Sequence, residues 1–131
     1  MKPKIIKPTR IKAQGKPPKA IQEFIGRANT GTEAVSLARM VSPQGWSEPG
    51  QTPEFDEFSL VLKGTLHVET KDGAIDVGAE EAFHAPKGAW VRYSTPHPGG
   101  AEYVAVCLPA FGPKLAHRDG DRSLAVSSGR R

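Results

Sequence analysis

The middle of the chain constrains the fold more than any other part. An apolar run at residues 58–62 is followed, after a lysine and Gly64, by residues 65–70, in which apolar and polar side chains alternate. Alternation with a period of two is typical of half-buried strands, and Asp72-Gly73 between two such runs is a strong hairpin signal. Gly64 suits a tight bend where a sheet curls over. The segment therefore predicts a curved antiparallel meander, as found in barrels and jelly rolls.

The same segment carries a resemblance to the cupin family. Glu57, six residues and Gly64 in EFSLVLKG are similar to the second half of the first cupin motif. The segment EEAFHAPKGAWVRYST is similar to the second motif, with Pro86-x-Gly88 matching and Glu80 in place of its opening glycine. The resemblance covers about residues 35–108 and extends to the cupin domain of ethanolamine-utilisation proteins. It implies an all-β fold, the cupin double-stranded β-helix or jelly-roll barrel, with an extended basic N-terminal arm before it.

The resemblance also implies that the metal-binding histidines of cupins are missing. Metal-binding cupins place two histidines before the motif-one glutamate and a third in motif two. The matching positions hold Gln51 and Pro53 (or Gly50 and Thr52 with a longer spacing) and Val91. Proline and valine offer a transition metal no side-chain ligand atom, and Glu57 alone remains of the four ligands. We therefore expect no stoichiometric metal and no other cofactor.

Composition is consistent with one domain. The chain has 131 residues, and its 14 glycines and 12 prolines favour a turn-rich β protein. One cysteine excludes an internal disulfide framework and favours a reducing compartment, so we expect a cytoplasmic protein. No apolar run approaches the ~18 residues of a membrane span, so we expect no membrane partner.

The net charge of +4 belongs to the arm, residues 1–19. The arm holds seven Lys/Arg and no acid, whereas residues 20–131 hold eleven Lys/Arg against fourteen Asp/Glu. One interpretation is a nucleic-acid or anionic-lipid arm, and the other is an extended arm that docks its isoleucines on the barrel or on a partner subunit. No aromatic residue interleaves with the charges for base stacking, so we favour docking and expect no nucleic-acid partner. Strand-forming isoleucines that need cover also predict a homodimer.

The rest of the chain divides around the meander. Alternating segments at 34–41, 81–85, 89–94 and 102–108 predict strands, and residues 20–27 predict a strand or a single turn. We expect the barrel to span residues 20–121, with a long loop at 42–54 and with residues 114–121 folding across it. Residues 122–131 predict a flexible tail.

Glu57 is the central candidate for function. The resemblance implies that it points into the barrel, and alternation sends Ser59 and Val61 the same way. A lone carboxylate in an apolar barrel needs hydrogen-bond donors or a raised pKa, because burial disfavours its charge. It is either a ligand anchor or a structural carboxylate that ties a strand to a loop. The candidate ligand-binding residues are Trp46, Glu48, Gln51, Glu57, Arg92 and Tyr93, and they predict a pocket for a small polar ligand.

Two alternatives stay open on the sequence. The first is a small enzyme, similar to isomerases, lyases or epimerases, that uses Glu57 with Tyr93 or His84 as an acid/base pair. Alternation alone does not orient His84, because the turn at residues 86–88 interrupts it. The second is a Ca²⁺ or Mg²⁺ site in the acidic segment 48–57, whose oxygen ligands suit a hard cation.

Overall fold

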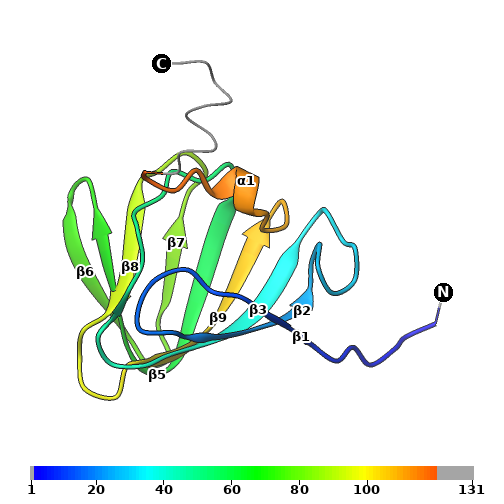
Figure 1. Ribbon diagram of the computed structural model, residues 1–131, viewed down its shortest axis with the longest axis horizontal. Coiled ribbons are helices and arrows are strands. Elements are labelled where there is room, and N and C mark those ends of the chain that lie inside the picture. The colour runs from blue at the N-terminus through cyan, green and yellow to red at the C-terminus, as the bar shows by residue number, and fades with distance from the viewer. Residues whose placement is uncertain (1, 121–131) are drawn as a thin grey trace.

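The computed structural model describes residues 2–120 and is an all-β structure with a single short helix in that part of the chain (Figure 1). The expected tail at 122–131 lies outside the described residues. The strands are β1 (Thr9–Ile11), β2 (Ala20–Ile25), β3 (Ser36–Ser42), β4 (Trp46–Ser47), β5 (Asp56–Thr70), β6 (Gly73–Gly78), β7 (Ala82–Ala85), β8 (Val91–Thr95) and β9 (Ala101–Leu108). Helix α1 spans Pro113–Ala116. Every strand pairing is antiparallel.

Strand β5 belongs to two sheets. Its first half pairs with β7 and β9 in sheet A, which runs β1-β2-β3-β9-β5-β7, and its second half pairs with β6 and β8 in sheet B, which runs β6-β5-β8-β4. The change of sheet occurs beside Gly64, which has φ +76°, and the register with β9 shifts between Val61 and Lys63. The two runs predicted as separate strands are therefore one bent strand. The predicted hairpin is confirmed, because Thr70 pairs with Gly73.

The core lies between the inner faces of the two sheets. Along β5, Ser59 and Val61 are buried as alternation predicts, whereas Phe58 and Leu60 are exposed on the outer face of sheet A. The core residues are Trp46, Val61, Leu66, Val68, Val77, Ala85, Val91, Tyr93, Ala101 and Tyr103. This curled antiparallel arrangement confirms the predicted jelly-roll architecture.

Both ends of the described chain cross the barrel. The arm adds β1 to the edge of sheet A and then pairs Lys16 with Ser47 in the loop 42–54. After α1, the chain pairs Arg118 with Gln51, as expected for residues 114–121. Between the two crossings, the arm and the residues after α1 lie over the barrel interior. No helix in residues 2–120 is long and apolar enough to cross a membrane.

The predicted strands match the observed ones within two residues, and the open alternative at residues 20–27 resolves as strand β2. Two strands are not predicted by the sequence: β1, in the arm, and β4, inside the loop 42–54. Three and two residues are too few to show a period of two, so only their pairing with β2 and with β8 defines them.

Gly64 should not tolerate a side chain. A Cβ there would collide with the carbonyl oxygen of Gly100, and the positive φ would add strain. We expect Gly64→Ala to lower the free energy of unfolding by more than about 2 kcal/mol. Gly45→Ala is the matched control, because Gly45 has a similar φ of +88° and open space around it. Denaturant titration of both variants checks this, and equal losses would contradict the packing argument.

Candidate functional site

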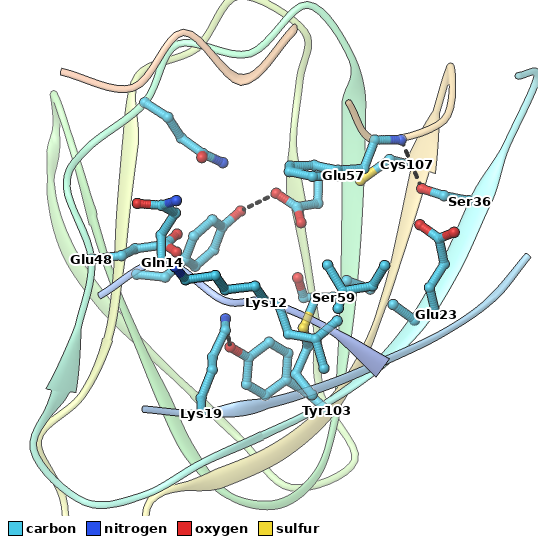
Figure 2. Close-up of a pocket in the computed structure, with 18 of the residues that line it drawn as sticks. Lys12, Gln14, Lys19, Glu23, Ser36, Glu48, Glu57, Ser59, Tyr103 and Cys107 are labelled. Atoms are coloured by element: carbon cyan, nitrogen blue, oxygen red, sulfur yellow. Dashed lines mark hydrogen bonds between the residues drawn. The ribbon is translucent and has the colours of Figure 1, made fainter. Parts of the chain in front are cut away.

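A cavity lies over the inner face of sheet A and is closed by the arm, the loop 42–54 and the residues after α1 (Figure 2). Its volume is about 80 Å³, counted over positions that the centre of a water molecule can occupy. Small side chains hollow out this face, since Ser36 lies opposite Cys107 and Ala105 lies between Ala38 and Ser59. The cavity is thus a consequence of small residues at neighbouring inward positions of three strands.

Glu57 reaches this cavity from β5. Tyr93, from sheet B, donates a hydrogen bond of 3.1 Å from its hydroxyl to Glu57 Oε1. Burial, and then the negative charge of Glu48, raise the pKa of Glu57 to about 7, against the opposing effects of the Tyr93 hydrogen bond and the charge of Lys19. The sequence predicts that a buried carboxylate at this position needs hydrogen-bond donors or a raised pKa, and Glu57 has both.

Glu48 is a second carboxylate in the same cavity, and Figure 2 shows it together with Glu57 and Lys19. It is buried, and burial raises its pKa, whereas the charges of Lys19 and Arg118 oppose the rise. Burial also raises the pKa of Tyr93 well above its ordinary value, with the charge of Glu57 adding to the effect. Tyr93 is therefore a hydrogen-bond donor at neutral pH.

Cationic side chains balance these carboxylates. Lys19 donates to the hydroxyl of Tyr103 at 3.1 Å, and its ammonium lies 3.9 Å from the centre of the Trp46 ring. Three carboxylates and three cationic side chains line the cavity in all: Glu23, Glu48, Glu57, Lys12, Lys19 and Arg118. Acidic and basic side chains are thus equal in number in the lining.

Two buried polar atoms in the cavity lining have no hydrogen-bond partner. They are Gln51 Oε1 and Arg118 Nε. A buried polar atom without a partner costs roughly 1–3 kcal/mol, so such atoms are uncommon in native interiors. One acceptor and one donor, both on residues that line the cavity, therefore have unmet hydrogen-bonding capacity.

The arm forms one wall of the site. Ile11, Lys12 and Gln14 line the cavity, and Trp46 Nε1 donates to the backbone oxygen of Gln14 at 3.1 Å. Of the isoleucines expected to dock the arm on the barrel, Ile11 lines the cavity, whereas Ile5 is 93% exposed. The cavity is therefore closed by a segment far in sequence from the strands that hollow it.

The structure brings together four of the six predicted ligand-binding residues: Glu48, Gln51, Glu57 and Tyr93 line the cavity. Trp46 is instead a core residue below Lys19. Arg92 points outward, where it pairs with Glu69 at 3.1 Å and donates to the backbone oxygen of Glu48. His84 is exposed on the outer face of sheet A, stacked on Phe58, so it does not meet Glu57.

Sequence reasoning missed Lys19, Tyr103 and Arg118. Tyr103 offered a signal, because it occupies an inward position of the predicted strand 102–108. Lys19 and Arg118 offered none, since they lie outside the strand pattern and reach the cavity through the crossings of the chain ends.

Within residues 2–120, no group of converging metal ligands lies in the barrel. None of the four histidines lines the cavity, and Val91 is a buried core residue. The carboxylates of the acidic segment 48–57 also do not converge, because Asp56 pairs with His84 and Glu54 pairs with His117, both outside the cavity. Among residues 2–120, this segment forms no group of three converging ligands.

Burial of Glu57 should make stability depend on pH. Its pKa is higher in the folded than in the unfolded chain, so its contribution to stability is present below about pH 4.5 and is lost as pH rises through about 7. We expect Glu57→Gln to gain on the order of 3 kcal/mol relative to the natural chain between pH 4.5 and pH 8. Denaturant titration at both values checks this.

Glu33→Gln is the matched control for that experiment, because the Glu33 side chain is 81% exposed. A difference between the natural chain and the Glu57 variant that stays constant with pH would contradict the raised pKa.

No protein-family model matches the chain. Several solved structures share its fold. The ethanolamine utilization protein EutQ of Salmonella typhimurium superposes with a TM-score of 0.61 at 16% identity, covering 82% of this chain and all of that one. A variant of Streptomyces PAC13 with uridine gives 0.70 at 13% identity, covering 90% and 91%. Oxalate decarboxylase of Bacillus subtilis gives 0.71 at 17% identity, covering 95% of this chain and 35% of that one. At these identities the likeness establishes the fold alone.

One curated protein is similar in sequence. Over 101 residues the chain is 45% identical to the endoribonuclease YbeY of Myxococcus xanthus. The match covers 77% of this chain but 34% of that protein, so the chain spans about a third of the length of this relative.

Proposed function

We propose that this chain, which has the cupin fold, binds a small polar ligand inside its barrel. The observation that carries the proposal is the pair of unpartnered atoms, Gln51 Oε1 and Arg118 Nε, buried in the lining of the cavity. A ligand that donates to the first and accepts from the second would remove the cost of both. Glu57, with its acceptor oxygens beside the Tyr93 hydroxyl, is the central anchor.

The balance of charges in the cavity favours a ligand that is neutral overall and rich in hydroxyl, amide or ring N–H groups. A nucleoside fits that description, because its ribose hydroxyls and base edge offer donors and acceptors without a net charge. Two of the similar proteins point the same way: the PAC13 structure contains uridine, and the relative from M. xanthus is an endoribonuclease. Uridine is therefore the first probe, and uridine monophosphate tests whether the cationic side chains favour a phosphate.

Glu57→Gln should weaken binding of uridine by about 10- to 150-fold, the effect of losing a charge-assisted hydrogen bond worth roughly 1.5–3 kcal/mol. Gln51→Met should also weaken binding, and it should stabilise the free protein, because it removes a buried acceptor that has no partner. Isothermal titration calorimetry and thermal melts check both results.

Glu54→Gln is the matched control, since Glu54 lies outside the cavity and pairs with His117. Mass spectrometry of the purified protein under native conditions identifies any other molecule that the barrel retains. Affinity that is unchanged in both the Glu57 and the Gln51 variants would contradict the proposed site.

A second candidate function is acid/base catalysis on the bound ligand, as in an isomerase, lyase or epimerase. It is favoured by the pKa of Glu57, about 7, which suits a group that both takes and returns a proton at neutral pH. Tyr93 is the partner within reach, as a donor, whereas His84 lies outside the cavity. Deuterium from ²H₂O incorporated into the ligand, and lost in Glu57→Gln, would distinguish catalysis from binding alone.

We also propose a homodimer that packs the outer faces of two A sheets together. Phe58, Leu60 and Leu62 on β5 are each about 40% exposed and form an apolar row. The arm pairs within its own chain, so face-to-face packing accounts for this row better than exchange of arms.

Leu60→Lys should convert the dimer into a monomer of 14.1 kDa, because it places a charge in the apolar face. Light scattering after gel filtration measures this. Ile75→Lys, equally exposed but on β6, should leave the dimer intact. A natural chain that is already monomeric at micromolar concentration would refute the proposal.

A further inference from the structure

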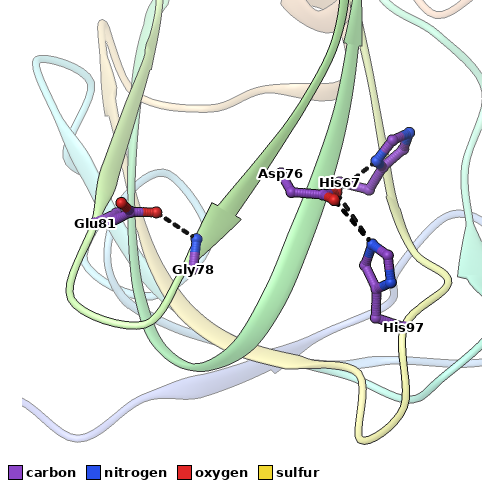
Figure 3. A network of polar contacts seen from close by, with 5 residues as sticks. All are labelled: His67, Asp76, Gly78, Glu81 and His97. Atoms are coloured by element: carbon purple, nitrogen blue, oxygen red, sulfur yellow. Dashed lines mark hydrogen bonds and ion pairs between the residues drawn. The ribbon is translucent and has the colours of Figure 1, made fainter.

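A second group of converging side chains lies on the outer face of sheet B, outside the cavity (Figure 3). It consists of His67 on β5, Asp76 on β6 and His97 in the loop between β8 and β9. His67 Nδ1 lies 2.7 Å from Asp76 Oδ1, and His97 Nε2 lies 3.1 Å from each carboxylate oxygen. The ligand atoms of all three residues lie within 4.8 Å of one another.

The backbone holds these residues in place. His67 and Asp76 are direct cross-strand partners, so the pairing of β5 with β6 sets their separation. His97 is held from its own loop, where Gly100 N donates to the His97 carbonyl and Thr65 N donates to the Gly100 carbonyl, both at 3.1 Å. Three separate elements therefore present the three side chains to one point.

We propose that His67, Asp76 and His97 bind a divalent transition metal ion, with Zn²⁺ as the best match. Two imidazole nitrogens and one carboxylate oxygen are borderline ligands of the kind that Zn²⁺ prefers, and three protein ligands leave a position for water. The side chains are 28–49% exposed, so solvent reaches that position.

A metal ion would replace the hydrogen bonds that join these side chains. A tetrahedral ion with bonds of about 2.0–2.1 Å keeps its ligand atoms roughly 3.3 Å apart, so it requires only small outward shifts from the hydrogen-bond distances of 2.7 and 3.1 Å found here. The other histidine–carboxylate pairs, His84–Asp56 and His117–Glu54, each have one imidazole and no third ligand in the part of the chain that the structure describes.

The ion would cross-link two segments near the bend of β5. It would join the loop of His97 to the β5–β6 hairpin, and that same loop packs its Gly100 carbonyl against Gly64. This site departs from the expectation of no metal, which considered only the barrel ligands of the cupin motifs. It is independent of the proposed ligand in the barrel, because it shares no residue with the cavity.

The test uses the untagged full chain, stripped with a chelator and titrated with Zn²⁺ alone by calorimetry. We expect one ion per chain, and His67→Ala and His97→Ala should each weaken binding by about tenfold or more through loss of one ligand. Saturating Zn²⁺ should raise the Tm of the natural chain but not that of His97→Ala. Co²⁺ should give the absorption bands of a tetrahedral site in the natural chain only.

His84→Ala and His117→Ala are the matched controls, since each removes one exposed imidazole that pairs with a carboxylate. Glu57→Gln should also bind Zn²⁺ unchanged, which separates this site from the barrel. His97 lies in an exposed loop, so its variant tests the site even if the His67 variant fails to fold. Affinity that is equal in the natural chain and in His97→Ala, or that falls as much in the controls, would overturn the proposal.

Discussion

The bend of β5 at Gly64 is the constraint on which the rest of the structure depends. A strand of fifteen residues can serve two sheets only if it turns from one into the other, and here it turns where the Gly100 carbonyl leaves no room for a side chain. Before the bend, Glu57 faces the cavity. After it, His67 faces the outer surface of sheet B. One strand thus contributes a residue to each of the two proposed sites.

Burial acts differently at the two sites. Inside the barrel, Glu48 and Glu57 lose hydration, and the hydrogen bond from Tyr93 and the charges of Lys19 and Arg118 offset only part of that loss, so the pKa of each carboxylate stays raised. A partly satisfied interior of this kind costs stability and is characteristic of functional sites. At the surface, His67, Asp76 and His97 need no such compensation, because solvent reaches them.

The fold is shared with proteins of 13–17% identity, and at such identities the likeness says nothing about the lining of the cavity. Small residues on sheet A create the space, and the arm and Arg118 close it from opposite ends of the described sequence. Since a fold does not specify a function, the evidence for a ligand lies in these side chains rather than in the architecture. The buried acceptor of Gln51, which has no hydrogen-bond partner, is the most direct part of that evidence.

The sequence by itself determined the longer strands and the Asp72-Gly73 hairpin, because a period of two is a local property of the backbone. The resemblance to cupins implied the inward direction of Glu57, and alternation extended it to Ser59. The sequence also determined that the cupin metal positions lack imidazoles. Tertiary structure alone decided that His84 lies outside, that Lys19 and Arg118 reach the cavity, and that His67, Asp76 and His97 converge. The residues brought together in this way are 9 to about 100 positions apart in the sequence. Their contacts depend on strand register and on the path of the chain ends, and local periodicity encodes neither.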